Sequence, residues 1–233
     1  MRYKRNNDVK TIFNKISCSY DFLNSLFSLG LHKIWKMKLV DLLKPIEGEN
    51  WADLCCGTGD LSFLIYTKVS PNGTVTGIDN AKQILNIAKQ RSKFIENKRL
   101  YWKLQDVFEI DEDLKIYDGI CMSYGLRNLV NVEEGLKKVF NLLSDKGRAG
   151  FLDFNHSKFN SMADIFQKVY LRLVVVPIAK FLKLSNEYSY IEKSIKKFPT
   201  GNKLVLIAKN VGFKKVEYRT IFLNQMGILI LEK

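Results

Sequence analysis

Short apolar runs alternate with amphipathic stretches through the middle of the chain. Apolar and β-branched runs over residues 50–56, 74–78, 100–104, 117–122 and 147–154 predict strands. Apolar positions at three- and four-residue spacing predict helices over 60–68, 81–95, 133–143 and 202–211. This alternation is typical of a parallel sheet covered by helices on both faces, so we predict an α/β fold whose ligands bind at the carboxyl ends of the strands.

The two ends of the chain follow other patterns. Residues 8–44 have helical spacing with an interruption at Ser28-Leu29-Gly30, and residues 159–184 form an unusually apolar helical stretch that Pro177 divides. Residues 213–220 and 226–231 predict a closing hairpin. No run of about 18 apolar residues occurs, so we expect no membrane-spanning helix.

The charge of the chain is unevenly distributed. The 233 residues hold 37 basic and 24 acidic side chains, a net charge of +13. Residues 1–50 hold nine basic and five acidic side chains, residues 51–155 hold 14 of each, and residues 156–233 hold 14 basic and five acidic. The excess that would suggest nucleic acid or an anionic membrane therefore belongs to the flanks. An AT-rich genome would also enrich lysine without any partner.

The cysteines favour neither a metal centre nor a disulfide framework. Cys18, Cys55, Cys56 and Cys121 include two sequence neighbours and contain no CxxC pair. We therefore expect no metal site, no structural disulfides and a reducing compartment.

A glycine-containing loop follows the first predicted strand. Gly57 and Gly59 let a ligand approach the backbone closely, but Ser62 stands where a dinucleotide-binding fingerprint has its third glycine. Asp53 and Asp60 flank the loop, and carboxylates there would repel a diphosphate and attract a sulfonium and an ammonium group. The sign of the charge favours S-adenosylmethionine over NAD.

Two more acids stand at predicted strand ends. Asp79 ends the second strand, where a carboxylate can accept hydrogen bonds from the ribose hydroxyls. Asp106 ends the third strand, where its carboxylate can accept a hydrogen bond from the adenine amino group. Each acid alone could equally be a turn or cap residue. The three successive strand ends together favour a cofactor site.

These motifs resemble the class I S-adenosylmethionine-dependent methyltransferases, and longer strings resemble one family of them. YDFLN at 20–24, LGLHKIW at 29–35, SYGLRN at 123–128 and EYSY at 187–190 are similar to the ubiquinone/menaquinone biosynthesis C-methyltransferases. The resemblance covers about residues 10–231. Cys55-Cys56, the sequence FPTG at 198–201 and the ending MGIL at 226–229 resemble most the cyanobacterial branch, which methylates 2-phytyl-1,4-naphthoquinone.

The resemblance implies a Rossmann-like fold with a mostly parallel seven-stranded sheet, an antiparallel final strand and helices on both faces. It implies one methyltransferase domain, divided into a helical N-terminal arm (1–44), a cofactor-binding core (45–155), a helical substrate cover (156–200) and a closing helix and strands (201–233). The implied activity is C-methylation of a prenylated or phytylated naphthoquinol in phylloquinone or menaquinone biosynthesis. Methylation of a benzoquinol in ubiquinone- or plastoquinone-type biosynthesis is the alternative.

The resemblance also assigns residues. The cofactor-binding candidates are Asp53, Gly57, Thr58, Gly59, Asp79, Asn80, Asp106, Val107 and Ser123. The substrate-binding candidates are Tyr124, Asn128, Asp153, Tyr188 and Tyr190, and the catalytic candidates are Arg127, His32 and Tyr20. Arginine stays protonated, so we expect Arg127 to stabilise a phenolate or orient a water. His32 is a base candidate by its ordinary pKa, with a purely structural role as the alternative.

The expected partners follow from the implied substrate. They are a lipid-tailed quinol, an anionic membrane contacted peripherally and a second copy of the chain, without nucleic acid. An RNA methyltransferase is the rival that the charge suggests, yet SYGL stands where such an enzyme would carry an amine-methylating signature. We expect the protein in the cytoplasm, peripheral to the inner or thylakoid membrane.

Overall fold

A computed structural model describes residues 30–95, 99–111, 116–155 and 185–233, together with residues 11, 25, 28, 169 and 177. Most of the expected first helix and most of the apolar stretch 159–184 lie outside the described residues. In the part that is described, no helix is long and apolar enough to cross a membrane.

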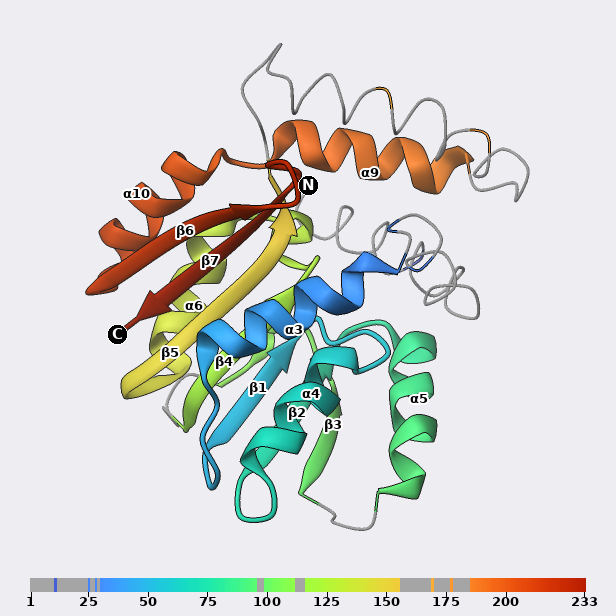
Figure 1. Ribbon diagram of the computed structural model, residues 1–233, viewed down its shortest axis with the longest axis vertical. Helices are drawn as coiled ribbons and strands as arrows, with labels where there is room; N and C mark the ends of the chain where they lie inside the picture. Colours follow the sequence, from blue (N-terminus) through green and yellow to red (C-terminus); the bar gives the residue numbers. More distant parts are fainter. Residues whose placement is uncertain are drawn as a thin grey trace.

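One seven-stranded sheet forms the centre of the molecule (Figure 1). Strands β1 to β5 run parallel, and β7 runs antiparallel to both of its neighbours, β5 and β6. The sheet order is β3-β2-β1-β4-β5-β7-β6, which confirms the predicted fold. The strands are β1 (Asn50–Leu54), β2 (Thr74–Asp79), β3 (Leu100–Leu104), β4 (Tyr117–Ser123), β5 (Leu143–Phe154), β6 (Lys215–Ile221) and β7 (Met226–Glu232).

The described helices agree with the expected ones to within a few residues. The clearest difference is the helix expected over 81–95, which ends at Arg91 and continues as a 3-10 turn over Ser92–Phe94. The helices are α3 (Leu31–Leu43), α4 (Asp60–Val69), α5 (Lys82–Arg91), α6 (Val132–Leu142), α9 (Ser185–Lys197) and α10 (Gly201–Val211), with 3-10 turns η3 (Val107–Glu109) and η4 (Leu126–Asn128).

Each face of the sheet has its own apolar core, because side chains alternate along a strand. On one face Leu39 of α3 and Ile65 of α4 pack with Trp51 of β1. On the other face Leu136 of α6 and Leu204 of α10 pack in a second core, which also contains Leu54, the β1 residue of opposite pleat. Both cores are closely packed apolar layers, which makes the sheet a rigid support for the loops at its ends.

Arg148 fastens the end of α3 to the sheet. Its guanidinium donates to both oxygens of Glu49 at 2.8 Å and to the carbonyl of Lys44 at 2.7 Å, just beyond the helix. The same group lies 5.0 Å above the ring of Trp51. A bidentate, partly buried pair of this kind fixes orientation as well as position, so α3 has a defined place beside α4.

The carboxyl ends of the parallel strands all reach one side of the molecule. Figure 1 shows α9 crossing there, beyond the end of β5, and α9 contacts the η4 turn that follows β4. The predicted ligand-binding side of the sheet is therefore the side on which α9 lies.

Candidate active site

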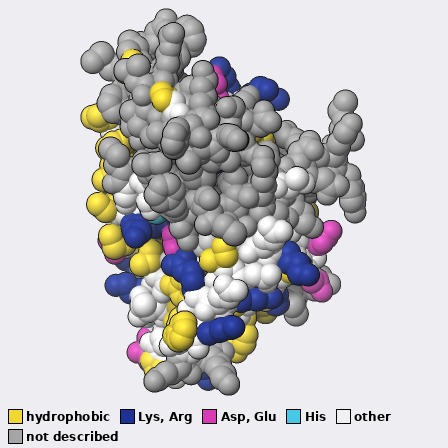
Figure 2. All heavy atoms as spheres, turned by 90° about the vertical axis from the view of Figure 1, so that its right-hand side faces the viewer, with side chains coloured by type: hydrophobic (Ala, Val, Ile, Leu, Met, Phe, Trp, Pro, Cys, Tyr) yellow, Lys and Arg dark blue, Asp and Glu magenta, His cyan; other side chains and the backbone are white. Residues whose placement is uncertain are grey.

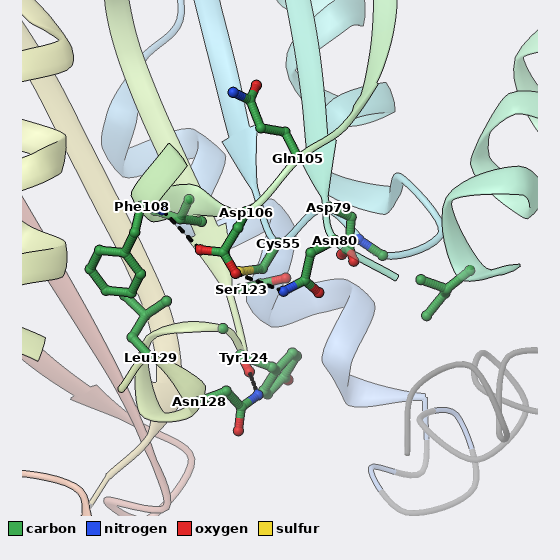
Figure 3. Close-up of a pocket in the computed structure, with 14 residues that line it drawn as sticks. Cys55, Asp79, Asn80, Gln105, Asp106, Phe108, Ser123, Tyr124, Asn128 and Leu129 are labelled. Atoms are coloured by element: carbon green, nitrogen blue, oxygen red, sulfur yellow. Dashed lines mark hydrogen bonds between the residues drawn. The ribbon is translucent and has the colours of Figure 1, made fainter. Parts of the chain in front are cut away.

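A pocket opens where β1, β2, β3 and β4 end (Figure 3). It contains about 690 Å³ of space, including its opening to solvent. Figure 3 shows Asp79, Asn80 and Asp106 grouped together, with Tyr124 and Asn128 beside them. The lining consists of Cys55, Gly57, Asp79, Asn80, Ile84, Gln105, Asp106, Val107, Phe108, Ser123, Tyr124, Gly125, Asn128 and Leu129.

The loop after β1 turns tightly into α4. Cys55, Gly57 and Gly59 all have positive φ, at 55°, 56° and 88°. A Cβ on Gly59 would lie 2.5 Å from the ring of Trp102, so only glycine fits there. The loop backbone is therefore exposed to the pocket at Gly57 and covered by Trp102 on its other side.

Asp53 supports this loop from below. Its carboxylate is buried and accepts from Ser62, from the backbone N–H at 2.9 Å and from the hydroxyl at 2.6 Å. It thereby satisfies an N–H in the first turn of α4, which has no intrahelical partner. Burial raises the pKa of Asp53 to about 6. The pocket lining does not include Asp53, which acts on the loop and not on the pocket surface.

Asp60 does not face the pocket with an unbalanced charge, contrary to the electrostatic argument from the sequence. It pairs with Lys36 at 2.9 Å and with Arg91 at 2.8 Å. Burial opposes ionisation, but these two cations outweigh it and lower the pKa of Asp60 to about 2. Arg91 also donates to the carbonyl of Thr58 at 2.8 Å. Thr58 and Gly59 therefore lie on the side of the loop that Arg91 holds, and they do not line the pocket.

Asp79 and Asp106 do line the pocket. Asp79 accepts from the backbone N–H groups of Gly57 at 2.9 Å and Ala81 at 2.8 Å. Burial raises the pKa of Asp79. Asp106 accepts from the side chain of Asn80 at 2.9 Å and from the backbone N–H of Phe108 at 3.0 Å. Each carboxylate oxygen has two lone pairs, so both groups keep acceptor capacity toward a ligand.

The end of β4 forms the opposite wall. Tyr124 has a φ of 60°, an uncommon value for a side-chain-bearing residue, and strain of this kind is concentrated at functional sites. Its carbonyl accepts from the Asn128 amide at 2.9 Å, and the Asn128 carbonyl accepts from the Tyr190 hydroxyl at 2.9 Å. Three predicted substrate-binding residues, from β4, η4 and α9, are therefore joined in one chain of hydrogen bonds.

Arg127 and Asp153 form a buried ion pair. The guanidinium donates to Asp153 at 2.7 Å and to the Tyr124 carbonyl at 2.8 Å, and it lies 5.0 Å from the ring of Phe154. The Asp153 carboxylate also accepts from the Arg127 backbone N–H at 3.1 Å. Neither residue lines the pocket, so the structure places both behind the wall that Tyr124 forms.

His32 is likewise away from the pocket lining. It is buried in the first turn of α3, and its Nδ1 lies 2.8 Å from the Ser28 hydroxyl. This arrangement is expected of a structural histidine. Tyr20 and the side chain of Tyr188 lie outside the described residues.

The charge of the lining is one-sided. Two carboxylates and several amide and hydroxyl groups face the space, and none of the 14 described lining residues has a basic side chain. Burial, with Asp79 and Asp106 nearby, raises the pKa of the Cys55 thiol, so this group stays neutral. The pocket therefore favours a ligand with hydroxyl and amino donors and a positive charge, and disfavours a diphosphate.

Sequence reasoning missed several lining residues. Gln105 directly precedes Asp106 at a strand end, so its position was a usable signal. Gly125 lies within the SYGLRN string, which was a usable signal as well, whereas Ile84, Phe108 and Leu129 are apolar and come from a helix and two turns. Only the packing of these segments against one another brings them to the pocket.

Comparisons with known proteins agree with this geometry. A model of the ubiE/COQ5 methyltransferase family matches residues 1–230. The 2-phytyl-1,4-naphthoquinone methyltransferase of Nostoc punctiforme is 37% identical over 228 residues, 97% of this chain and 99% of that protein. The chloroplastic 2-phytyl-1,4-beta-naphthoquinone methyltransferase of Arabidopsis thaliana is 35% identical over 230 residues, 97% of this chain and 88% of that protein. The solved structure of a SAM-dependent methyltransferase from Aquifex aeolicus is similar in fold, with a TM-score of 0.62 and 13% identity over 84% of this chain and 88% of that one.

The raised pKa of Asp53 predicts a pH-dependent stability. The carboxyl titrates near 3.8 when unfolded and at about 6 when folded, so the folded protein holds the proton more tightly. The free energy of unfolding should fall as pH rises through this window, by about 3 kcal/mol relative to an Asp53→Asn variant that cannot ionise. Urea unfolding of both proteins across the window measures the difference. A difference that does not change with pH would contradict the assignment.

Asp79 should contribute directly to cofactor affinity. An Asp79→Asn variant loses a charged acceptor, so we expect S-adenosylmethionine to bind at least about tenfold more weakly by calorimetry. Asp145→Asn makes the same charge change at an exposed position far along the sheet and is the matched control. Equal affinity for the two variants would remove Asp79 from the binding site.

Proposed function

The chain belongs to the ubiE/COQ5 methyltransferase family, and from this we propose that it transfers a methyl group from S-adenosylmethionine to a ring carbon of 2-phytyl-1,4-naphthoquinol. The observation that carries the proposal is the pocket lining, with two carboxylates and no basic side chain among the described lining residues. The family membership supplies the reaction class, and the names of the relatives supply the substrate. The reaction belongs to the synthesis of phylloquinone.

The residues of the pocket fit the cofactor. Asp79 would accept the ribose hydroxyls, Asp106 and the backbone at Val107 would hold the adenine, and the backbone at Gly57 and Ser123 would face the methionine part. S-adenosylmethionine supplies an electrophilic methyl group on a sulfonium. The acidic lining would attract the positively charged cofactor, and the walls would fix the direction in which the methyl group points.

The acceptor must be the reduced ring, because a quinone carbon is electron-poor. When a quinol hydroxyl loses its proton, electron density reaches the neighbouring carbon, which forms the new C–C bond. The S–C bond of the methyl donor would break as this C–C bond forms, which releases a neutral thioether. The ring carbon would then lose its hydrogen as a proton, which restores the aromatic ring. Tyr124, Asn128 and Tyr190 offer a phenol edge and amide groups to orient the ring.

Arg127 contributes to this reaction by positioning and as part of an ion pair. Its guanidinium remains protonated, so it does not serve as the base. Its bond to the Tyr124 carbonyl, with Asp153 behind it, holds the wall against which the ring would lie. Its charge is balanced by Asp153, so at this wall the ion pair acts as an oriented dipole and not as a free positive charge.

Two other substrates are alternatives. A benzoquinol would need the same chemistry, but the relatives compared above are named for a naphthoquinone. An RNA is disfavoured because the charge excess belongs to the flanks and not to residues 51–155. We further propose that the enzyme works at the cytoplasmic surface of the inner or thylakoid membrane, where a phytylated substrate resides, and that it pairs with a second copy.

The direct test is methyl transfer from radiolabelled S-adenosylmethionine. The purified protein is offered 2-phytyl-1,4-naphthoquinol, a prenylated benzoquinol and RNA in separate reactions. We expect label in the naphthoquinol, recovered in the organic phase. Label in the benzoquinol alone or in RNA alone would overturn the proposal.

Arg127 should be needed for turnover and not for cofactor binding. We expect Arg127→Ala to lower kcat at least about a hundredfold, while the Kd for S-adenosylmethionine changes little. Because the change also leaves the Asp153 charge buried, it should cost about 3–5 kcal/mol of stability. The double variant Arg127→Met/Asp153→Asn removes both charges, keeps a side-chain oxygen for the backbone N–H groups that Asp153 accepts from, and should recover most of the stability without the activity. Wild-type turnover in the double variant would show that Arg127 acts only on the fold.

A further inference from the structure

Four large apolar side chains are exposed on α3 and on the β6–β7 turn, two elements that meet in a ring contact. Ile34 and Met37 of α3 are 55% and 45% exposed, and Phe222 and Leu223 of the β6–β7 turn are 40% and 68% exposed. Single exposed apolar residues are ordinary, but a contiguous group marks an interaction surface. We refer to these four residues as the α3 rim.

A ring contact joins the two parts of the α3 rim. Trp35, next to Ile34, lies with its ring 5.3 Å from the ring of Phe222. Ile34 and Met37 are one helical turn apart, on the side of α3 opposite the buried Leu39 and Leu43. The helix and the turn therefore meet at Trp35 and Phe222, and Ile34 and Met37 follow on the solvent-facing side of the helix.

The turn keeps these residues at a conformational cost. Phe222, Leu223 and Asn224 have φ values of 50°, 52° and 63°, in the left-handed region where glycine and asparagine are preferred. Asn155 holds the turn in place, since its backbone N–H donates to Gln225 and its side chain to the Asn224 carbonyl, both at 2.8 Å. The backbone conformation alone would favour Asn or Gly at both positions. The ring contact with Trp35 accounts in part for Phe222, whereas Leu223, 68% exposed, points to a separate purpose.

The charge beside the α3 rim is positive. Lys33 and Lys38 are exposed on α3, and in the described part of the chain neither forms a salt bridge, whereas Lys36 points inward to Asp60. Asp41 is the exposed acid among the described residues of α3. The surface that faces the viewer in Figure 1 lies at the left margin of Figure 2. Hydrophobic side chains there have Lys and Arg beside them. Apolar residues with lysines at their border match an anionic lipid surface.

The α3 rim lies at the pocket end of the sheet. The β6–β7 turn begins β7, which runs antiparallel to β5, so it stands beside the carboxyl end of β5. Figure 1 shows the first half of α3 reaching toward the same end. A surface held there against a bilayer would bring the pocket close to a lipid-tailed acceptor.

We propose that the α3 rim docks on an anionic membrane, with Ile34, Met37, Phe222 and Leu223 among the lipid headgroups and Lys33 and Lys38 against their phosphates. This proposal rests on the proposed function, because the lipid tail of the proposed substrate is the reason for the protein to bind a membrane. It concerns a different surface from the cofactor pocket and can be tested separately.

Vesicle co-sedimentation tests the α3 rim. The probes are neutral phosphatidylcholine vesicles and vesicles that also contain phosphatidylglycerol, at low and high ionic strength. We expect binding to the anionic vesicles, with Phe222→Asn/Leu223→Asn reducing the partition coefficient at least about tenfold. Asparagine suits the backbone of the turn, but the variant also loses the ring contact between Phe222 and Trp35, so its melting temperature is measured beside that of the wild type to show that it is folded. Lys33→Gln/Lys38→Gln should weaken binding to anionic vesicles and reduce its salt dependence.

Leu206→Asn is the matched control. Leu206 is 60% exposed on α10, which packs on the opposite face of the sheet, so this variant should bind vesicles like the wild type. Equal binding by the rim variant and the control would overturn the proposal. A change of oligomeric state in the rim variant by light scattering would also overturn it, since the rim would then bind a second copy.

A short-tailed, water-soluble naphthoquinol separates this inference from the proposed function. Without vesicles, the rim variant and the wild type should methylate it at the same rate. Methylation without vesicle binding would refute the α3 rim alone. Vesicle binding through the α3 rim without methylation of any quinol would refute the proposed function and leave the membrane surface standing.

Discussion

The loops at the carboxyl end of the sheet depend on aspartates that accept backbone N–H groups. Asp53 accepts from Ser62, Asp79 from Gly57 and Ala81, Asp106 from Phe108, and Asp153 from Arg127 and Phe154. Parallel strands end together, so their following loops begin with N–H groups that no strand partner satisfies. A short carboxylate at each of four strand ends satisfies these donors from within.

These four aspartates differ in the groups that balance their charge. This difference separates the aspartates that support the fold from those that also face the pocket. Asp153 is paired with Arg127 behind the pocket wall, and Asp53 is buried beneath the loop against Ser62. Asp79 and Asp106 line the pocket itself, in a lining without a basic side chain. From the sequence alone, each of these acids could be either a capping residue or a ligand-binding residue. The structure shows that Asp79 and Asp106 cap their loops and also have oxygens at the pocket surface.

The side of the pocket that we propose for the substrate is assembled from elements far apart in the chain. Tyr124 after β4, Asn128 in η4 and Tyr190 in α9 are connected by hydrogen bonds, and Arg127 holds the same turn from behind. The α3 rim, from α3 and the β6–β7 turn, stands at the same end of the sheet. An enzyme that takes its acceptor from a bilayer needs its binding wall and its membrane surface on one side, and a parallel sheet provides that geometry.

The sequence by itself determined the sheet-and-helix order, the loop glycines and the strand-end acids, because periodicity and strand termini are local properties. It also indicated most of the pocket lining, including Gly57, Asp79, Asn80, Asp106 and Ser123. Only the tertiary structure decided that Asp60 is neutralised by Lys36 and Arg91, and that Arg127 pairs with Asp153. The partners in these pairs lie 24 to 31 residues apart in the chain, and the sequence pattern does not specify which charges meet. The apolar lining residues Ile84, Phe108 and Leu129 were undetectable for the same reason, since an apolar side chain has the same local pattern whether it faces a core or a pocket.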